Sequence, residues 1–272
     1  MVEADTTTLP IYEKPPITEV ACSILFPQIV NMRSPHIGLL WQRFQAEYPI
    51  CEDVAPITSR LEVFGSQKGE AKLELSNLPP LPRVWFISED NTRLVQVQRD
   101  RFIYNWRKAN SDSKYPRYSY LIQSFQSHLE EFDSFLRDAN LEPVQPIQYE
   151  LTYVNQIPQG ESWSTFEDIG KFFPDIHWKT SSSRFLEKPQ SISWSTVFEL
   201  PDKVGRLYAS VKPGHSDEKL VISFELTVRG IGNYKSKDQL QDWFDIAHES
   251  IVCSFADLTH EEVQVKVWQR RS

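Results

Sequence analysis

Glycine is scarce in this chain, with only 9 glycines among 272 residues. Loops that cradle a nucleotide phosphate need glycines at fixed spacing, because the backbone must approach the phosphate closely. The segment GSQKGE at positions 65–70 has glycines and a lysine, but it lacks the P-loop spacing and the serine or threonine that follows it. The sequence therefore predicts no phosphate-binding loop, and we expect no cofactor.

Cysteine is also rare, and the three cysteines, Cys22, Cys51 and Cys253, lie far apart. Their odd number and wide spacing argue against a disulfide framework or a zinc knuckle, and they fit a reducing cytoplasm. His248 and Cys253 lie on one predicted helix, where a five-residue separation turns their side chains roughly 140° apart. We therefore expect no metal site and no catalytic site at the histidines.

Long apolar runs are missing too. No stretch approaches the roughly 20 apolar residues that a membrane helix needs. Residues 1–14 carry acids and threonines where a signal peptide would be apolar, so we interpret them as a mobile tail. We expect a cytoplasmic protein without a membrane contact. The net charge of −8 argues against a nucleic-acid coat, but it is compatible with a local basic patch.

Enough apolar residues are present for a sizeable core, since 40% of the chain is hydrophobic. In the first half, alternation and turn residues predict strands at 17–26, 60–64, 71–75, 84–88, 94–98 and 101–107. The last two form a hairpin if Arg99-Asp100 makes the turn. Ser34-Pro35 is a typical helix start, and we expect that helix to end at Pro49. Apolar residues at three- and four-residue spacing predict a long amphipathic helix at about 119–139.

The second half has a similar order of predicted elements. Strands are expected at 147–157, 192–200, 206–211 and 220–229. A capping box at Ser164–Glu167 predicts a short helix that ends at Pro174. A final long helix is predicted from Ser236 onward, and the alternating residues Val263, Val265 and Val267 predict a closing strand.

The two halves can also be aligned directly. EVACSILFPQ (Glu19–Gln28) matches ELTYVNQIPQ (Glu150–Gln159) without gaps, and a helix, a meander and a long helix follow in each case. We therefore predict an α+β protein with two similar halves, 15–146 and 147–272, in one compact unit. Each half is expected to hold an antiparallel sheet backed by its long helix. Such sheets leave one face for a ligand, a partner or the other half.

The stretch Gln96–Tyr118 mixes cations and aromatic rings more densely than any other part of the chain. Alternation puts Phe102, Tyr104 and Trp106 on one face of the hairpin, where they either pack in the core or stack on a ligand, and we favour the core. The candidate partner- or nucleic-acid-binding residues are Arg99, Arg101, Asn105, Arg107, Lys108, Tyr115, Arg117 and Tyr118. A second candidate site consists of Glu150, Tyr153 and Asn155.

Five short motifs are shared with one known family. They are PPI-x-E at Pro15–Glu19, WF-x-S at Trp85–Ser88, Q-x-Q-x-x-RF-x-x-NWR at Gln96–Arg107, YP-x-Y at Tyr115–Tyr118 and E-x-x-Y-x-N at Glu150–Asn155. Over residues 15 to about 160, the chain resembles a sporadically distributed prokaryotic family of uncharacterised proteins. The patchy distribution of that family is similar to that of defence and toxin–antitoxin genes. The resemblance therefore implies a protein partner encoded nearby, and it supplies no activity or catalytic residue.

Three hypotheses about function follow from the sequence. The first is a non-catalytic recognition protein that binds a protein partner, because tyrosine and arginine are common anchors in interfaces. The second is binding of RNA or single-stranded DNA through the basic and aromatic hairpin. The third is a hydrolase that uses Glu150 and Asn155, which would need a pocket that brings both residues together with a histidine.

Overall fold

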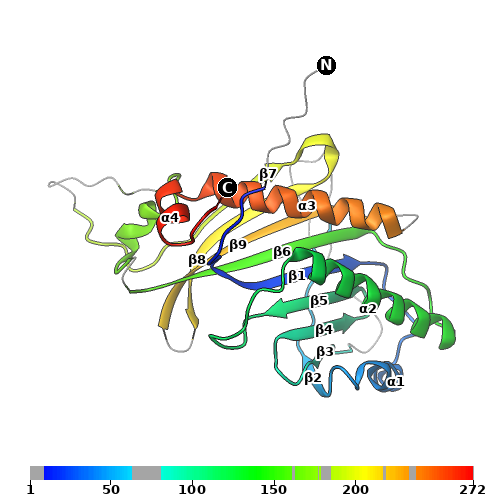
Figure 1. Ribbon diagram of the computed structural model, residues 1–272. Helices are drawn as coiled ribbons and strands as arrows, with labels where there is room; N and C mark the ends of the chain where they lie inside the picture. Colours follow the sequence, from blue (N-terminus) through cyan, green and yellow to red (C-terminus); the bar gives the residue numbers. More distant parts are fainter. Residues whose placement is uncertain are drawn as a thin grey trace.

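The computed structural model describes residues 9–62, 81–160, 163–176, 178, 185–216, 219–232 and 237–271. Within these residues, nine strands form one antiparallel sheet in the order β2-β3-β4-β5-β1-β6-β9-β8-β7 (Figure 1). The protein is therefore an α+β protein with a large antiparallel sheet and a few helices.

The elements follow one another in two series. The first contains β1 (Ile17–Leu25), α1 (Ser34–Phe44), β2 (Ile50–Val54), β3 (Arg83–Ile87), β4 (Arg93–Gln98), β5 (Arg101–Arg107) and α2 (Tyr118–Asp138). The second contains β6 (Gln148–Pro158), the 3₁₀ helix η1 (Phe166–Lys171), β7 (Trp194–Glu199), the 3₁₀ helix η2 (Pro201–Lys203), β8 (Arg206–Ser216), β9 (Lys219–Ile231), α3 (Lys237–Leu258) and α4 (Glu261–Lys266). The predicted β4–β5 hairpin and the predicted long helix of the first half are confirmed.

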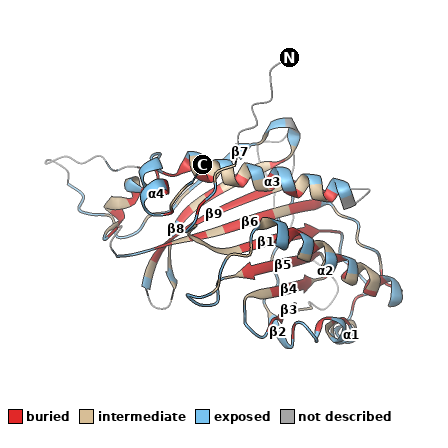
Figure 2. Ribbon diagram, viewed as in Figure 1, coloured by how far each residue is buried: buried red, intermediate tan, exposed pale blue. Residues whose placement is uncertain are grey.

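The two long helices lie on the same face of the sheet (Figure 1). Helix α2 contacts β5 and β1, and α3 contacts β9 and β6. We call this side the helix face, and its strand residues, such as Val20 and Leu151, are buried in the core (Figure 2). The opposite side, which we call the far face, carries the intervening strand residues, among them Glu19 and Glu150.

The rings of β5 pack in the core. The ring centroid of Phe102 is 5.1 Å from that of Phe132 on α2, and the centroid of Tyr104 is 5.2 Å from that of His128 on the same helix. Together with Trp106, these β5 residues are at most 3% exposed. The core interpretation of the three rings is confirmed, so they are not available for stacking on a ligand.

The two halves meet where β1 pairs with β6. Ala21 lies opposite Thr152 near the middle of this antiparallel pair. The prediction of a separate sheet in each half is wrong, because the β1–β6 ladder joins the strands of both halves into one sheet. A site near this pair can therefore draw residues from both halves.

Several local predictions also differ from the structure. The predicted closing strand at Val263–Val267 is the helix α4, because His260 accepts a hydrogen bond as its N-cap and two glutamates occupy its first turn. Residues 60–62 of the predicted strand 60–64 are not in a strand, and the exposed strand β2 has no predicted counterpart. The predicted strand 71–75 and the GSQKGE segment lie outside the described residues.

Two helices are shorter than predicted. Helix α1 begins at Ser34 as expected, but it ends at Phe44 rather than at Pro49. The predicted helix after Ser164 is the 3₁₀ helix η1, and its capping box is formed by Thr165 and Asp168, one residue later than expected.

Residues 9–14, which belong to the predicted mobile tail, are held against the C-terminal end of the chain. Tyr12 is 7% exposed and forms a β-bridge with Arg270, and its hydroxyl donates to Gln264 Oε1 at 3.0 Å. The backbone N–H of Glu13 donates to the carbonyl of Gln269. The prediction is wrong for this part of the tail, and residues 1–8 lie outside the described chain.

Candidate binding site

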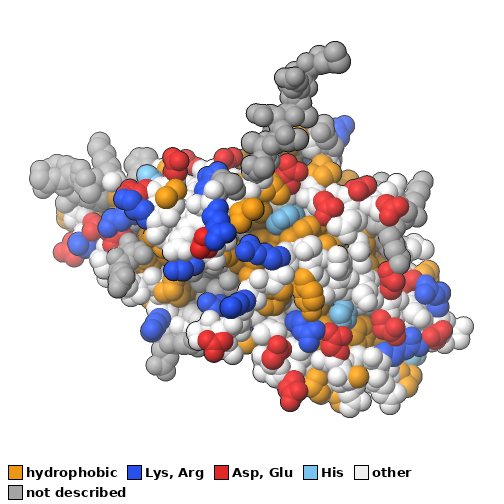
Figure 3. Space-filling model, in the orientation of Figure 1, with side chains coloured by type: hydrophobic (Ala, Val, Ile, Leu, Met, Phe, Trp, Pro, Cys, Tyr) orange, Lys and Arg blue, Asp and Glu red, His pale blue; other side chains and the backbone are white. Residues whose placement is uncertain are grey.

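A pocket of about 530 Å³ opens on the helix face between residues 9–17, β6, the start of α2 and α3. Figure 3 shows hydrophobic side chains gathered in a hollow on this face, beside Lys and Arg side chains. Its volume and its mainly apolar lining are those of a ligand pocket. We call it the apolar pocket, and its principal lining residues are Tyr12, Tyr115, Tyr118, Tyr153, His248 and Phe255.

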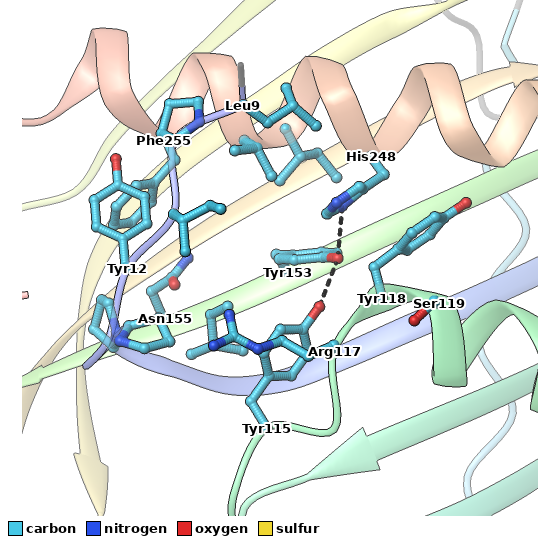
Figure 4. Close-up of a pocket in the computed structure, with 17 residues that line it drawn as sticks. Leu9, Tyr12, Tyr115, Arg117, Tyr118, Ser119, Tyr153, Asn155, His248 and Phe255 are labelled. Carbon is cyan, nitrogen blue, oxygen red and sulfur yellow. Dashed lines mark hydrogen bonds between the residues drawn. The ribbon is translucent and has the colours of Figure 1, made fainter. Parts of the chain in front are cut away.

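A short chain of hydrogen bonds runs along the apolar pocket (Figure 4). The hydroxyl oxygens of Tyr115 and Tyr153 are 3.0 Å apart, and the Tyr153 hydroxyl is 2.9 Å from Nδ1 of His248. The ring of Tyr118 stacks on that of His248 with centroids 4.0 Å apart, while its hydroxyl donates to Asp245 at 2.7 Å. These contacts fix the orientation of the imidazole and of three phenol rings.

The hydrogen-bonded side chains of His248, Tyr115 and Tyr153 are uncharged at neutral pH. Burial lowers the pKa of His248 from 6.5 to about 4, and the nearby Asp245 carboxylate offsets only part of this effect. Burial raises the pKa of Tyr115 to about 12 and raises the pKa of Tyr153 well above its usual value. Arg117 also lines the pocket and is exposed, so it supplies a positive charge next to an uncharged interior.

The periods of strand and helix explain why these side chains meet. Tyr153 and Asn155 are alternate residues of β6 and therefore share one face of the sheet. The amide of Asn155 is buried and donates to the carbonyl of Phe224 at 3.3 Å. On α3, His248 and Phe255 are separated by about two helical turns, so both lie on the side of the helix that lines the pocket.

The loop before α2 brings Tyr115 and Tyr118 to the pocket. Arg117 is the N-cap residue of α2 and has φ of 75°, in the left-handed region that residues other than glycine adopt uncommonly. This conformation turns the chain between Tyr115 and Tyr118, and both rings line the same pocket. The segment Tyr115–Tyr118 therefore forms part of the pocket wall, as a loop that leads into the first residue of α2.

The predicted site residues are divided between the two faces of the sheet. Those that line the apolar pocket are Tyr115, Arg117, Tyr118, Tyr153 and Asn155. A second hollow, of about 540 Å³, lies on the far face and is lined by Arg101, Asn105 and Glu150. The structure therefore separates Glu150 from Asn155, and the pair that the hydrolase hypothesis requires does not share a pocket.

The other predicted cations occupy neither hollow. The side chain of Arg99 is buried, and its Nη2 donates to the carbonyl of Met32 at 2.9 Å. Arg107 Nε donates to the carbonyl of Asn91 at 3.0 Å, and its guanidinium lies 5.7 Å from the centroid of the Trp85 ring. Lys108 is exposed at the end of β5. Arg99 and Arg107, which were predicted to contact nucleic acid, therefore donate hydrogen bonds to carbonyl groups of this chain.

Sequence reasoning did not find His248 or Tyr12 as site residues. His248 follows Phe244 by one helical turn and precedes Ile251 by three residues, which places it on the inward side of α3. That spacing is a signal for a buried position. No local pattern identifies Tyr12, because it reaches the pocket through pairing with the distant C-terminal segment.

The comparisons with known proteins provide no assignment of function, so the site is interpreted from its geometry. No family model matches the chain, and no curated protein matches it. No helix of the described residues has the length and apolar character needed to cross a membrane. In the same part of the chain, no group of three or more histidine, cysteine, aspartate or glutamate residues is placed to hold a metal ion.

Proposed function

We propose that the protein is a non-catalytic recognition protein that binds a protein partner through the apolar pocket. The observation that carries this proposal is the combination of tyrosine rings, an uncharged interior and the exposed Arg117 in one hollow. Tyrosine and arginine around an apolar hollow are typical anchors of protein interfaces. In the proposed complex the partner places an apolar side chain in the pocket and a carboxylate beside Arg117.

Nucleic acid is the second candidate, because Lys108 and Arg117 are exposed at the two ends of one loop. A single-strand binding surface combines a track of cations with exposed rings. Here Arg99 and Arg107 contact carbonyl groups of this chain, and the three β5 rings are core residues. These contacts favour a protein partner over nucleic acid.

The family resemblance supports the choice of a protein partner. We infer that the chain belongs to that sporadically distributed prokaryotic family and acts in a defence or toxin–antitoxin module, with its partner encoded nearby. Cys22, Cys51 and Cys253 are free thiols, which supports a reducing cytoplasm as the compartment.

We also infer that the two halves are a duplicated unit, each with its own long helix. In the gapless alignment Glu19 corresponds to Glu150, and each lies opposite an arginine of the next strand, Arg107 and Arg229 respectively. The strand order supports the same relation, because β5 and β4 follow β1 outward as β9 and β8 follow β6. The apolar pocket then lies where the two repeats meet.

The proposal is tested with the products of genes adjacent to the gene of this chain. Each is co-purified with the wild type and with two variants of α3. Val252→Arg places a charge in the apolar pocket, whereas Ile246→Arg changes a residue that is 44% exposed and does not line it. We expect one neighbouring protein to bind the wild type and Ile246→Arg equally. We expect Val252→Arg to bind roughly tenfold or more weakly, a loss of about 1.4 kcal/mol.

The same preparations are titrated with labelled single-stranded RNA and DNA at low and physiological salt, after circular dichroism has confirmed folding. If no neighbouring protein binds, the protein-partner proposal fails. Nucleic-acid binding that weakens steeply with salt and is lost in Arg117→Ala would then put the second candidate in its place.

A further inference from the structure

The hollow on the far face, which we call the ionic cleft, has a volume of about 540 Å³ and is lined by charged side chains of both halves. Its principal lining residues are Glu19, Arg83, Arg101, Glu150, Glu225 and Arg229. The sheet separates it from the apolar pocket, because consecutive residues of β6 point to opposite faces. The cleft is therefore independent of the surface to which we assign the protein partner.

The carboxylates of the cleft already have partners. Glu150 Oε1 lies 2.9 Å from Arg229 Nε, and Glu225 Oε2 lies 3.9 Å from the ammonium group of Lys212. Glu19 accepts a hydrogen bond from the Asn105 amide, and burial raises the pKa of this carboxyl group. Glu150 and Glu225 therefore pair with cations other than Arg83 and Arg101, whereas Glu19 offsets part of the charge of Arg83.

The guanidinium groups of Arg83 and Arg101 each have an N–H group without a hydrogen-bond acceptor in the described chain. Arg101 is 4% exposed, and its Nη2 donates to Ser59 Oγ at 3.0 Å, while its Nε is 3.7 Å from Asp100 Oδ1. Arg83 Nη1 donates to Gln96 Oε1 at 2.8 Å. Among the described residues, no group accepts a hydrogen bond from Nε of either arginine. Burial lowers the pKa of Arg83, the charge of Arg101 lowers it further, and the Glu19 carboxylate offsets part of this effect. The two cations are therefore close enough to repel each other.

A hydroxyl group on β1 adds a third unused polar atom. Ser23 is 4% exposed, and its Oγ has no hydrogen-bond partner within the described chain, although it lines the cleft with both arginines. A buried polar group without a partner costs free energy. Repulsion between neighbouring cations in a desolvated site costs free energy as well. One anionic group in the cleft would remove both costs.

We propose that the ionic cleft binds an oxyanion group of a small ligand, a carboxylate or a phosphate, through Arg83, Arg101 and Ser23. Guanidinium groups match the planar geometry of a carboxylate and the oxygens of a phosphate, and the hydrogen bonds are strengthened by charge. The amides of Asn105 and Gln96 also line the cleft, where they hydrogen-bond to each other, to Glu19 and to Arg83, and so hold the carboxylate and one guanidinium in place.

The test measures binding of inorganic phosphate and of citrate to the full chain by calorimetry, at constant ionic strength. Arg83→Gln removes one cation of the cleft. Arg43→Gln is the matched control, because this arginine lies on α1 and pairs with Glu131 and Asp138 instead. We expect saturable binding to the wild type and to Arg43→Gln, with roughly tenfold weaker binding to Arg83→Gln.

Ser23→Ala is the second variant, and it separates a ligand contact from a structural role. Removing a hydroxyl group without a partner leaves the unliganded chain as stable as before or more stable. We expect the same variant to bind the probe anion more weakly. Binding of phosphate alone or of citrate alone would identify the oxyanion class. The proposal is overturned if a folded wild type binds neither probe saturably at millimolar concentration, or if both cleft variants bind like Arg43→Gln.

Discussion

The helix face and the far face of the β1–β6 pair are built from the same strands, yet they carry opposite kinds of hollow. On the helix face, the Tyr153 hydroxyl forms hydrogen bonds with Tyr115 and with the neutral His248 in an apolar pocket. On the far face, Glu150 of the same strand pairs with Arg229 at the edge of an ionic cleft. The two-residue period of a strand therefore lets one sheet hold an uncharged site and an ionic site back to back.

The two faces also differ in what stabilises them. Tightly packed rings stabilise the helix face, where loss of a side chain leaves a cavity. Half-buried ion pairs on the far face contribute little net free energy, because their attraction is offset by desolvation. We therefore expect substitutions on the helix face to lower stability more than comparable substitutions on the far face.

The largest difference is expected between Phe102→Ala and Val154→Ala. Phe102 is fully buried against two rings of α2, so its truncation should lower the free energy of unfolding by about 4 kcal/mol. Val154 is half-buried beside the ionic cleft, and its truncation should cost about 1 kcal/mol. Urea unfolding measures both values, and equal losses would contradict the contrast between the faces.

The second effect concerns pH and the neutral imidazole of His248. Its pKa is about 4 in the folded chain and 6.5 without burial, so the unfolded state binds more protons between these values. The neutral imidazole therefore contributes to the free energy of unfolding in full above pH 6.5, and this contribution is lost as the pH falls toward 4. The shift corresponds to about 3 kcal/mol.

This pH effect is measured by urea unfolding at pH 7 and pH 4.5 in the wild type and in His248→Gln. The charged group that raises the pKa of the imidazole is Asp245, and the facing phenols of Tyr118 and Tyr153 stay protonated in this range. We expect the variant to lose less stability on acidification than the wild type. A loss of the same size in both proteins would show that the pocket does not hold a neutral histidine.

The third effect separates the middle of the hydrogen-bond chain from its end. Tyr153→Phe leaves both Tyr115 and His248 without their shared partner, so the free energy of unfolding should fall by about 1–2 kcal/mol. Tyr115→Phe removes only the terminal hydroxyl and should cost about half as much. If thermal unfolding ranks the two variants in the reverse order, the hydrogen-bond chain is not what orders the pocket.

The smallest effect is expected for Glu150→Gln on the far face. The side chains of Glu150 and Arg229 are 15% and 21% exposed, and the guanidinium also lies 4.7 Å from the centroid of the Tyr208 ring. We expect a loss of about 1 kcal/mol at low salt that shrinks as salt screens the pair. A loss as large as that of Phe102→Ala would show that ion pairs stabilise the far face.

The sequence was sufficient to predict elements whose signals are local. The β4–β5 hairpin and α2 follow from hydrophobic period and turn residues within single segments. Alternating valines gave the wrong element at α4, where Val265 is 53% exposed and Gln264 is 1% exposed. Three alternating residues are a weak strand signal, whereas the N-cap at His260 and the two glutamates of the first turn favour a helix.

The candidate site was only partly predictable, because its assembly depends on contacts distant in sequence. Tyr115, Tyr153 and Asn155 were identified by type and pattern, but their shared pocket requires α3 to lie across β6. The division of Arg101 and Glu150 onto the far face follows from strand alternation, once the pairing of β5 with β1 and the β1–β6 register are known. That register joins the two halves, and no local pattern specifies it.

The most direct test of the central claim is a site-specific photo-crosslink from the apolar pocket. Benzoyl-phenylalanine replaces Val252, which lines the pocket, or Ile246, which does not, and each protein is irradiated with the co-purified partner. We predict crosslinks from position 252 alone, to one peptide of the partner that contains an apolar side chain. Crosslinks from position 246, with none from position 252 in an intact complex, would contradict the assignment of the pocket as the partner site.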